Sequence, residues 1–254
     1  MNFQDKIYNN LLILRKKINK VRKRFHDTVT DFDFMKKSTL IVIPGYIGLL
    51  IICVIVAYFF GGAQQGPGEY FIWTNWISDL GGSPYTPAPW LYDMACIIAG
   101  ALTIPFTFYL EKLLVPMPQK PEDYKKTTRL RYRIGSFAIL FSIIGNLGYI
   151  LVGIFSEDRD YYSMHGISSG LAFGGFIFGA FFLGWLIILY NCKIPKIIGI
   201  YGVIGPFTSG ILYIIFGGPF LEWLMLFAIL AWIIPLSLAI LHNEELHLYT
   251  RKTP

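Results

Sequence analysis

One histidine, one serine and a group of aspartates are the side chains of this sequence that could do chemistry together. His165 follows a segment that carries Asp158 and Asp160, and an earlier polar segment carries Ser78-Asp79. An imidazole can activate a serine hydroxyl as its general base, and it can share a metal ion with carboxylates. The alternative is a purely structural role, in which each aspartate bonds the backbone of its own turn and His165 is a structural hydrogen-bond partner. The spacing fits no known metal-ligand motif, so catalysis by Ser78, Asp79 and His165 stays the lesser alternative. We predict instead a ligand-binding set of Ser78, Asp79, Asp158, Asp160 and His165.

The placement of the histidines narrows the cofactor chemistry further. The other histidines, His26, His242 and His247, belong to the two ends of the chain. A haem held by two histidines or a zinc site with several imidazole ligands therefore has no ligand pair in one place. We expect no cofactor and no metal site.

Six apolar runs, each long enough to cross a bilayer, must position these residues. They cover residues 38–60, 90–115, 132–155, 165–191, 196–216 and 220–241. Of the 22 lysines and arginines, all except Arg159 fall in the two ends of the chain or in alternate connections between the runs. Because cytoplasmic loops retain Lys and Arg, both termini should be cytoplasmic. The sequence predicts an all-α, multi-pass protein of the cell membrane with six transmembrane helices.

Acidic residues show the opposite distribution and gather on the predicted outer face. Seven of them map to outer connections or outer span ends: Glu69, Asp79, Asp93, Glu157, Asp158, Asp160 and Glu222. Three tryptophans, Trp73, Trp76 and Trp90, accompany the first outer connection and suit the membrane interface. We therefore expect a polar, strongly negative pocket at this face.

The first 37 residues form a separate arm, and residues 38–254 form the membrane domain with a cytoplasmic tail from about residue 242. Apolar residues recur along the arm at alternating steps of four and three, among many basic residues: Ile7, Leu11, Leu14, Ile18, Val21 and Phe25. Such a basic amphipathic helix is typical of segments that lie on anionic inner-leaflet lipid. A short coiled coil with a copy of the chain or with a partner is the rival interpretation. Because the basic residues line membrane edges, we do not expect nucleic-acid binding.

Glycines at four-residue spacing mark the fourth span. Gly166, Gly170 and Gly174 form one row, and Gly175 and Gly179 make a second small pair. Small residues at this spacing allow another helix to approach closely, so we predict a helix-packing role for the first row. The alternative is that this row forms a dimer interface or a groove for a lipid. Binding to a partner membrane protein or to a second copy of the chain is therefore also consistent with the sequence.

The spans carry almost no ionisable residues. Asn146 is the clearest polar group at depth, and we expect it to hydrogen-bond another helix. A proton- or ion-coupled carrier usually needs charge near the middle of the membrane, so the sequence argues against transport, except transport of an uncharged, lipid-like solute.

The order of short motifs resembles a known group of membrane proteins. These motifs are Ile77-Ser78-Asp79-Leu80-Gly81, a proline-rich stretch, Val152-Gly153-Ile154-Phe155 and His165-Gly166. They resemble the prokaryotic six-span family named domain of unknown function 998 and, more distantly, the DRAM-type membrane proteins of eukaryotes. The resemblance covers residues from about 40 to 250 and implies the six-span fold and an important outer pocket. In that family a proline typically follows the Gly-Ile-Phe segment, where this chain has Ser156.

These observations together favour a binding protein over an enzyme. We expect a non-enzymatic integral membrane protein whose outward-facing polar pocket binds a lipid or a partner membrane protein. The alternative is a membrane-embedded hydrolase or transferase that acts on an outer-leaflet lipid. That alternative requires Ser78, Asp79 and His165 to converge within hydrogen-bond reach.

Overall fold

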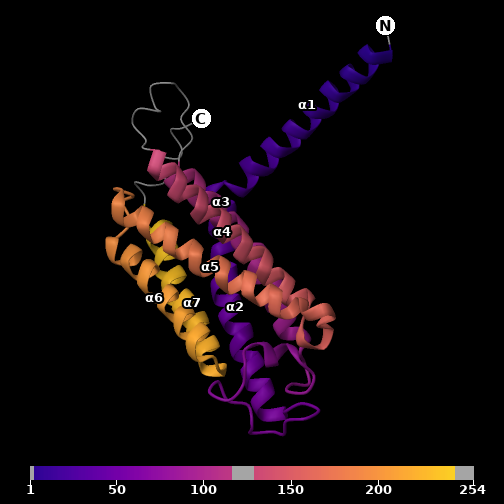
Figure 1. Cartoon of the computed structure of the whole chain (residues 1–254), viewed down its shortest axis with the longest axis vertical. Helices are drawn as coiled ribbons and strands as arrows, with labels where there is room; N and C mark the ends of the chain where they lie inside the picture. Colours follow the sequence, from indigo (N-terminus) through magenta and orange to yellow (C-terminus); the bar gives the residue numbers. More distant parts are fainter. Residues whose placement is uncertain (1–2, 116–128, 244–254) are drawn as a thin grey trace.

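A bundle of six long apolar helices makes up most of the chain (Figure 1). The computed structural model describes residues 3–115 and 129–243, and these described parts contain no strand. The spanning helices are α2 (Phe32–Phe60), α3 (Trp90–Leu114), α4 (Arg129–Ile154), α5 (Met164–Leu189), α6 (Lys196–Phe216) and α7 (Pro219–Leu241). The predicted class and the six spans are confirmed. Within the predicted tail and second connection, residues 244–254 and 116–128 lie outside the described parts.

The bundle has two unlike ends. The start of α2 and the end of α7 contribute Met35 and Ile240 to one buried cluster, so we call this the terminus end. The opposite end carries the long connection 61–89 and the shorter connection 155–163, and we call it the loop end (Figure 1). Three short 3-10 helices lie at the loop end: η1 (Ser78–Gly81), η3 (Glu157–Arg159) and η4 (Tyr161–Ser163).

A separate basic helix, α1 (Phe3–Val29), projects away from the bundle (Figure 1). The helical structure is interrupted between α1 and α2 at Asp31. The Oδ1 of Asp31 accepts a hydrogen bond of 2.9 Å from the Phe34 amide and so caps α2. For this reason the first spanning helix begins at Phe32 rather than at residue 38. The ring of Phe25 touches Phe108 of α3 with centroids 6.2 Å apart, whereas Ile18 and Val21 on α1 stay exposed. The side chains of Ile7 and Leu11 lie outside the described set.

Glycines bring α4 and α5 into direct backbone contact. A Cβ on Gly148 would lie 2.5 Å from the Ala172 amide, and one on Gly175 would lie 2.3 Å from the Gly145 amide. No side chain fits at such distances, so the two backbones touch directly. Asn146 lies beside this contact, fully buried, and its Nδ2 donates to Thr107 Oγ1 of α3 at 3.0 Å. The expected interhelical hydrogen bond of Asn146 is confirmed.

Candidate functional site

The connection 61–89 forms a hydrogen-bonded cap over the loop end, and Asp79 lies inside it. Asp79 Oδ2 accepts from the Trp76 amide at 2.9 Å and from Asn75 Nδ2 at 3.2 Å. The residue is 3% exposed, and burial raises the pKa of Asp79 to about 6, with the nearby charge of Glu157 adding to the effect. The hydrogen bonds of Asp79 thus stay within its own turn, as in the structural role that the sequence left open.

Helix α7 holds this cap in place. Glu222 Oε2 accepts from the Ile77 amide at 2.7 Å, and Trp223 Nε1 donates to the Asn75 carbonyl at 3.0 Å. The Tyr70 hydroxyl donates to the Trp76 carbonyl at 2.8 Å. Glu222 and Trp223, both buried near the start of α7, therefore fix the residues on both sides of Trp76.

The second connection is fastened by ion pairing and backbone contacts. Arg159 lies 2.5 Å from Asp93 of α3, and it also donates to the Gly153 carbonyl at 3.0 Å. Asp158 accepts from the amide of Ser83 at 2.9 Å and from its hydroxyl at 3.0 Å, which ties η3 to the cap. Asp93 therefore links α3 to the second connection, and Asp158 links η3 to the cap.

His165 is oriented by the backbone at the start of α5. Its amide donates to Asp160 Oδ1 at 2.8 Å, and its Nδ1 lies 2.7 Å from the Phe155 carbonyl. Since a carbonyl only accepts, Nδ1 carries the proton in this contact and neutral imidazole keeps Nε2 as an acceptor. The ring borders the cleft described next.

A cleft of about 600 Å³ opens between α5, α6 and α7 beside the cap. Ser78, Glu157, His165 and Glu222 line its polar part. Trp76, Ser169 and Tyr213 also line the cleft. The rest of the wall is apolar or glycine, and it comes from α5, α6 and α7: Gly166, Gly170, Phe173, Gly174, Ile177, Phe178, Phe207, Gly210, Ile211, Ile214 and Met225. Its volume lies in the range of sites that bind small molecules.

The predicted helix-packing row faces this cleft. A Cβ on Gly166, Gly170 or Gly174 would meet nothing within 4 Å, so no helix of the described chain packs on them. Close packing is found instead at Gly175, on the neighbouring face of α5. Toward the terminus end, a Cβ on Gly184 would lie 2.5 Å from the Gly199 carbonyl oxygen. Helices α5 and α6 therefore touch there and separate toward the loop end.

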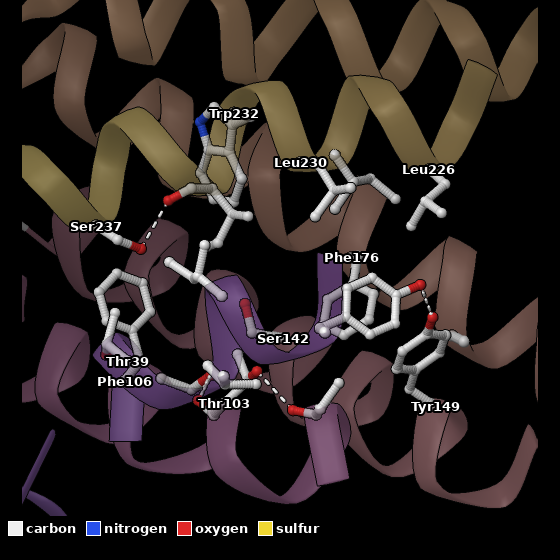
Figure 2. Close-up of a pocket in the computed structure, with 18 of the residues that line it drawn as sticks. Thr39, Thr103, Phe106, Ser142, Tyr149, Phe176, Leu226, Leu230, Trp232 and Ser237 are labelled. Carbon is white, nitrogen blue, oxygen red and sulfur yellow. Dashed lines mark hydrogen bonds between the residues drawn. The ribbon is translucent and has the colours of Figure 1, made fainter. Parts of the chain in front are cut away.

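A second, smaller cavity of about 110 Å³ lies inside the bundle (Figure 2). Tyr149 hydrogen-bonds Tyr46 at one side of it, and Ser237 donates to the Ile233 carbonyl at 2.7 Å. Thr103 likewise donates to its own helix, at the Ala99 carbonyl. No charged residue lines this cavity, and the Ser237 and Thr103 hydroxyls already donate within their own helices. It offers less for recognition of a polar group than the cleft does.

The candidate site brings together only part of the predicted set. Ser78 and His165 line the cleft, whereas Asp79, Asp158 and Asp160 do not. No hydrogen bond joins Ser78, Asp79 and His165 in the structure: Asp79 binds Asn75 and Trp76, and His165 binds Asp160 and the Phe155 carbonyl. Within residues 3–115 and 129–243, no three His, Cys, Asp or Glu side chains are grouped to hold a metal ion.

Sequence reasoning missed two important residues of the loop end. Glu222 counted only as one of seven outer acids, although an acid within an otherwise apolar last span was a usable signal. Asn75 was not singled out, yet its side chain bonds Gln65, Phe71 and Asp79. Nothing in the local sequence marks an asparagine as the centre of such a network.

Comparison with known proteins adds a family but no individual relative. Searches of curated proteins and of solved structures gave no match. A family described as Frag1/DRAM/Sfk1/Cwh43P N-terminal domain matches residues 39–243, which cover all six spanning helices from early in α2 to the end of α7. This agrees with the resemblance to DRAM-type proteins. The chain belongs to the Frag1/DRAM/Sfk1/Cwh43P N-terminal domain family.

Proposed function

We propose that this membrane protein binds a lipid in the cleft between α5, α6 and α7. The observation that carries the proposal is the shape and chemistry of the cleft. Polar side chains, including His165 and Glu222, line its wall beside the cap, and an apolar wall with open glycines continues along α5. A lipid has the same division, with a polar headgroup and an apolar chain.

The narrowing of the cleft favours a lipid over a partner helix. Helices α5 and α6 touch at Gly184 and Gly199, and they separate toward the loop end. A helix with its side chains is about 10–12 Å across along its whole length, so it does not fit a space that closes to contact. A single acyl chain is narrow enough to enter it.

In this proposal the loop end faces outward and both termini are cytoplasmic in the cell membrane. The support is the distribution of Lys and Arg, of which Arg159 alone belongs to the loop end. Helix α1 then lies beside the inner leaflet, where its basic residues would meet anionic lipid. Closer kinship with the prokaryotic family of domain of unknown function 998 remains part of the same proposal.

The geometry supports binding better than catalysis. An acyl transfer or hydrolysis would need a base hydrogen-bonded to the Ser78 hydroxyl, and neither candidate base makes that bond in the structure. The Asp79 carboxylate is bound to Trp76 and Asn75, and His165, which keeps Nε2 as an acceptor, is not hydrogen-bonded to Ser78. The enzymatic alternative therefore lacks an activated nucleophile in this arrangement.

Photolabelling of the full chain in nanodiscs tests the proposal. The probe is a phosphatidylcholine that carries a diazirine in one acyl chain. We expect labels on residues 166–178 of α5 and 207–214 of α6, above the level on other lipid-facing helices. Gly170→Leu should remove these labels, because its side chain would fill the cleft from a position with open space.

Gly48→Leu is the matched control, since a Cβ on Gly48 also meets nothing within 4 Å and this residue does not line the cleft. It should label like the unchanged chain. Even labelling around the whole bundle, or a pattern unchanged by Gly170→Leu, would refute the lipid site. Crosslinking of the cleft to a copurified protein would refute it in favour of a partner.

A further inference from the structure

The polar part of the cleft holds two carboxyl groups and no lysine or arginine side chain. Glu222 is 7% exposed and lines the cleft, and Glu157 lines it from η3. The residues that line the cleft include no lysine or arginine. Arg159, the basic residue of this end, is engaged by Asp93 and Gly153. A carboxyl group buried to this degree pairs with a cation or takes up a proton, so an ammonium group on the ligand can supply the positive charge that this wall does not.

Aromatic rings stand beside these carboxylates. Trp76 and Tyr213 both line the cleft, with ring centroids 6.2 Å apart and planes at 87°. Trp76 directly precedes Ile77, whose amide binds Glu222, so the indole and the buried carboxylate belong to one contact region. Carboxylates combined with the faces of Trp and Tyr form the surroundings that favour an ammonium group.

A metal ion fits this region less well than an ammonium. A hard divalent cation takes six to eight oxygen ligands in a compact shell. Among the described residues no group of three or more acidic, His or Cys side chains is placed for that. An ammonium needs only a nearby negative charge and an aromatic face.

We propose that the cleft selects lipids whose headgroup carries an ammonium, as in phosphatidylethanolamine and phosphatidylcholine, and discriminates against anionic headgroups. This inference rests on the proposed lipid site and names the class of lipid that it takes. Glu222 and Glu157 attract the ammonium, Trp76 and Tyr213 contact it, and His165 and Ser78 offer hydrogen-bonding atoms to the rest of the headgroup. An anionic headgroup without an amine would meet two carboxylates and no cation.

Native mass spectrometry of the full chain in detergent can measure this preference. The probes are phosphatidylethanolamine, phosphatidylcholine and phosphatidylglycerol with identical acyl chains. We expect the two amine lipids to bind about tenfold more tightly than phosphatidylglycerol, which corresponds to about 1.4 kcal/mol. Glu222→Gln should bring the three affinities close together, while its side-chain oxygen still accepts from the Ile77 amide.

Two further variants protect the test from a folding artefact. Glu157 is exposed, so Glu157→Gln should reduce the preference without disturbing packing. Glu69 bonds the Gly66 amide and does not line the cleft, so Glu69→Gln should leave the preference at its original value. Soluble phosphocholine should compete weakly, since it lacks the acyl chain.

The outcomes separate this inference from the proposed function. Equal affinities for the three lipids, with binding that Gly170→Leu still abolishes, would overturn the headgroup inference alone. Absence of a stoichiometric lipid in the unchanged chain would overturn both. A preference for phosphatidylglycerol that appears only with added Ca²⁺ would show a metal site instead of an ammonium site. Competition by phosphocholine as strong as that of the lipids would show an amine site that needs no lipid chain.

Discussion

Two adjacent glycines on α5 provide a direct test of the helix packing. Gly175 faces α4, and a Cβ there would lie 2.3 Å from the Gly145 amide, against at least 3.4 Å for ordinary van der Waals contact. Gly174 faces the cleft, and a Cβ there meets nothing within 4 Å. The same Gly→Ala change therefore adds one methyl group to a closed contact or to open space.

The expected free energies follow from this difference. Both variants gain up to about 1 kcal/mol because alanine has a higher helix propensity than glycine. Gly175→Ala must also push α4 and α5 apart by about 1 Å, and such overpacking costs about 1–3 kcal/mol. We expect Gly175→Ala to lower the free energy of unfolding by about 1–2 kcal/mol, and Gly174→Ala to leave it unchanged or raise it.

Unfolding of the purified chain in detergent, followed by tryptophan fluorescence, measures both changes. For a chain of this size the expected loss lowers the midpoint of thermal unfolding by about 2–8 °C. Equal midpoints for Gly175→Ala and Gly174→Ala would refute the direct backbone contact. A larger loss of stability for Gly174→Ala than for Gly175→Ala would mean that Gly174, and not Gly175, faces α4.

Three further predictions concern polar contacts. The pKa of Asp79 is raised to about 6, mainly by burial; the folded chain therefore binds the proton before the unfolded chain does as the pH falls. Its free energy of unfolding should rise by about 3 kcal/mol from about pH 7 to about pH 3, and Asp79→Asn should remove this part of the pH dependence in a series of unfolding curves. Arg159→Ala should cost about 1–3 kcal/mol, less than a fully buried pair because the Arg159 side chain is 48% exposed, and the loss should shrink when Asp93→Asn is already present. Tyr149→Phe leaves the Tyr46 hydroxyl without its partner at the central cavity and should cost about 1 kcal/mol; thermal unfolding that is unchanged would contradict the contact.

The six spans could be predicted from sequence because apolar length is a property of each segment by itself. The expected run 196–216 coincides with α6, and the others differ by a few residues at their ends. The largest difference is at α2, where Asp31 caps the helix and so extends it through the polar residues that precede the apolar run. A division of the chain by hydrophobicity assigns Lys36 and Lys37 to the basic arm, although both residues belong to α2.

The candidate site was less predictable, because its geometry depends on contacts between distant segments. The motif Ser78-Asp79 was recognised, yet Asp79 turned out to bind the backbone of its own turn, while Glu222 from the last span took the place beside the cleft. The spacing of Gly166, Gly170 and Gly174 on α5 did not indicate which neighbour these residues face. Sequence spacing states which face of a helix carries small residues, but the neighbour across that face is decided by the whole bundle.

The hydrogen bond between the Ile77 amide and Glu222 has a consequence for synthesis of the chain. Its two partners are separated by 145 positions, which a ribosome adds in roughly 7–30 s at ordinary elongation rates. During that interval Asn75 and Ile77 have been synthesised, but the helix that binds them has not been made. These backbone groups must stay hydrated until α7 is inserted, so the cap is completed last. Protease resistance of residues 70–80 during translation would therefore report insertion of the final helix.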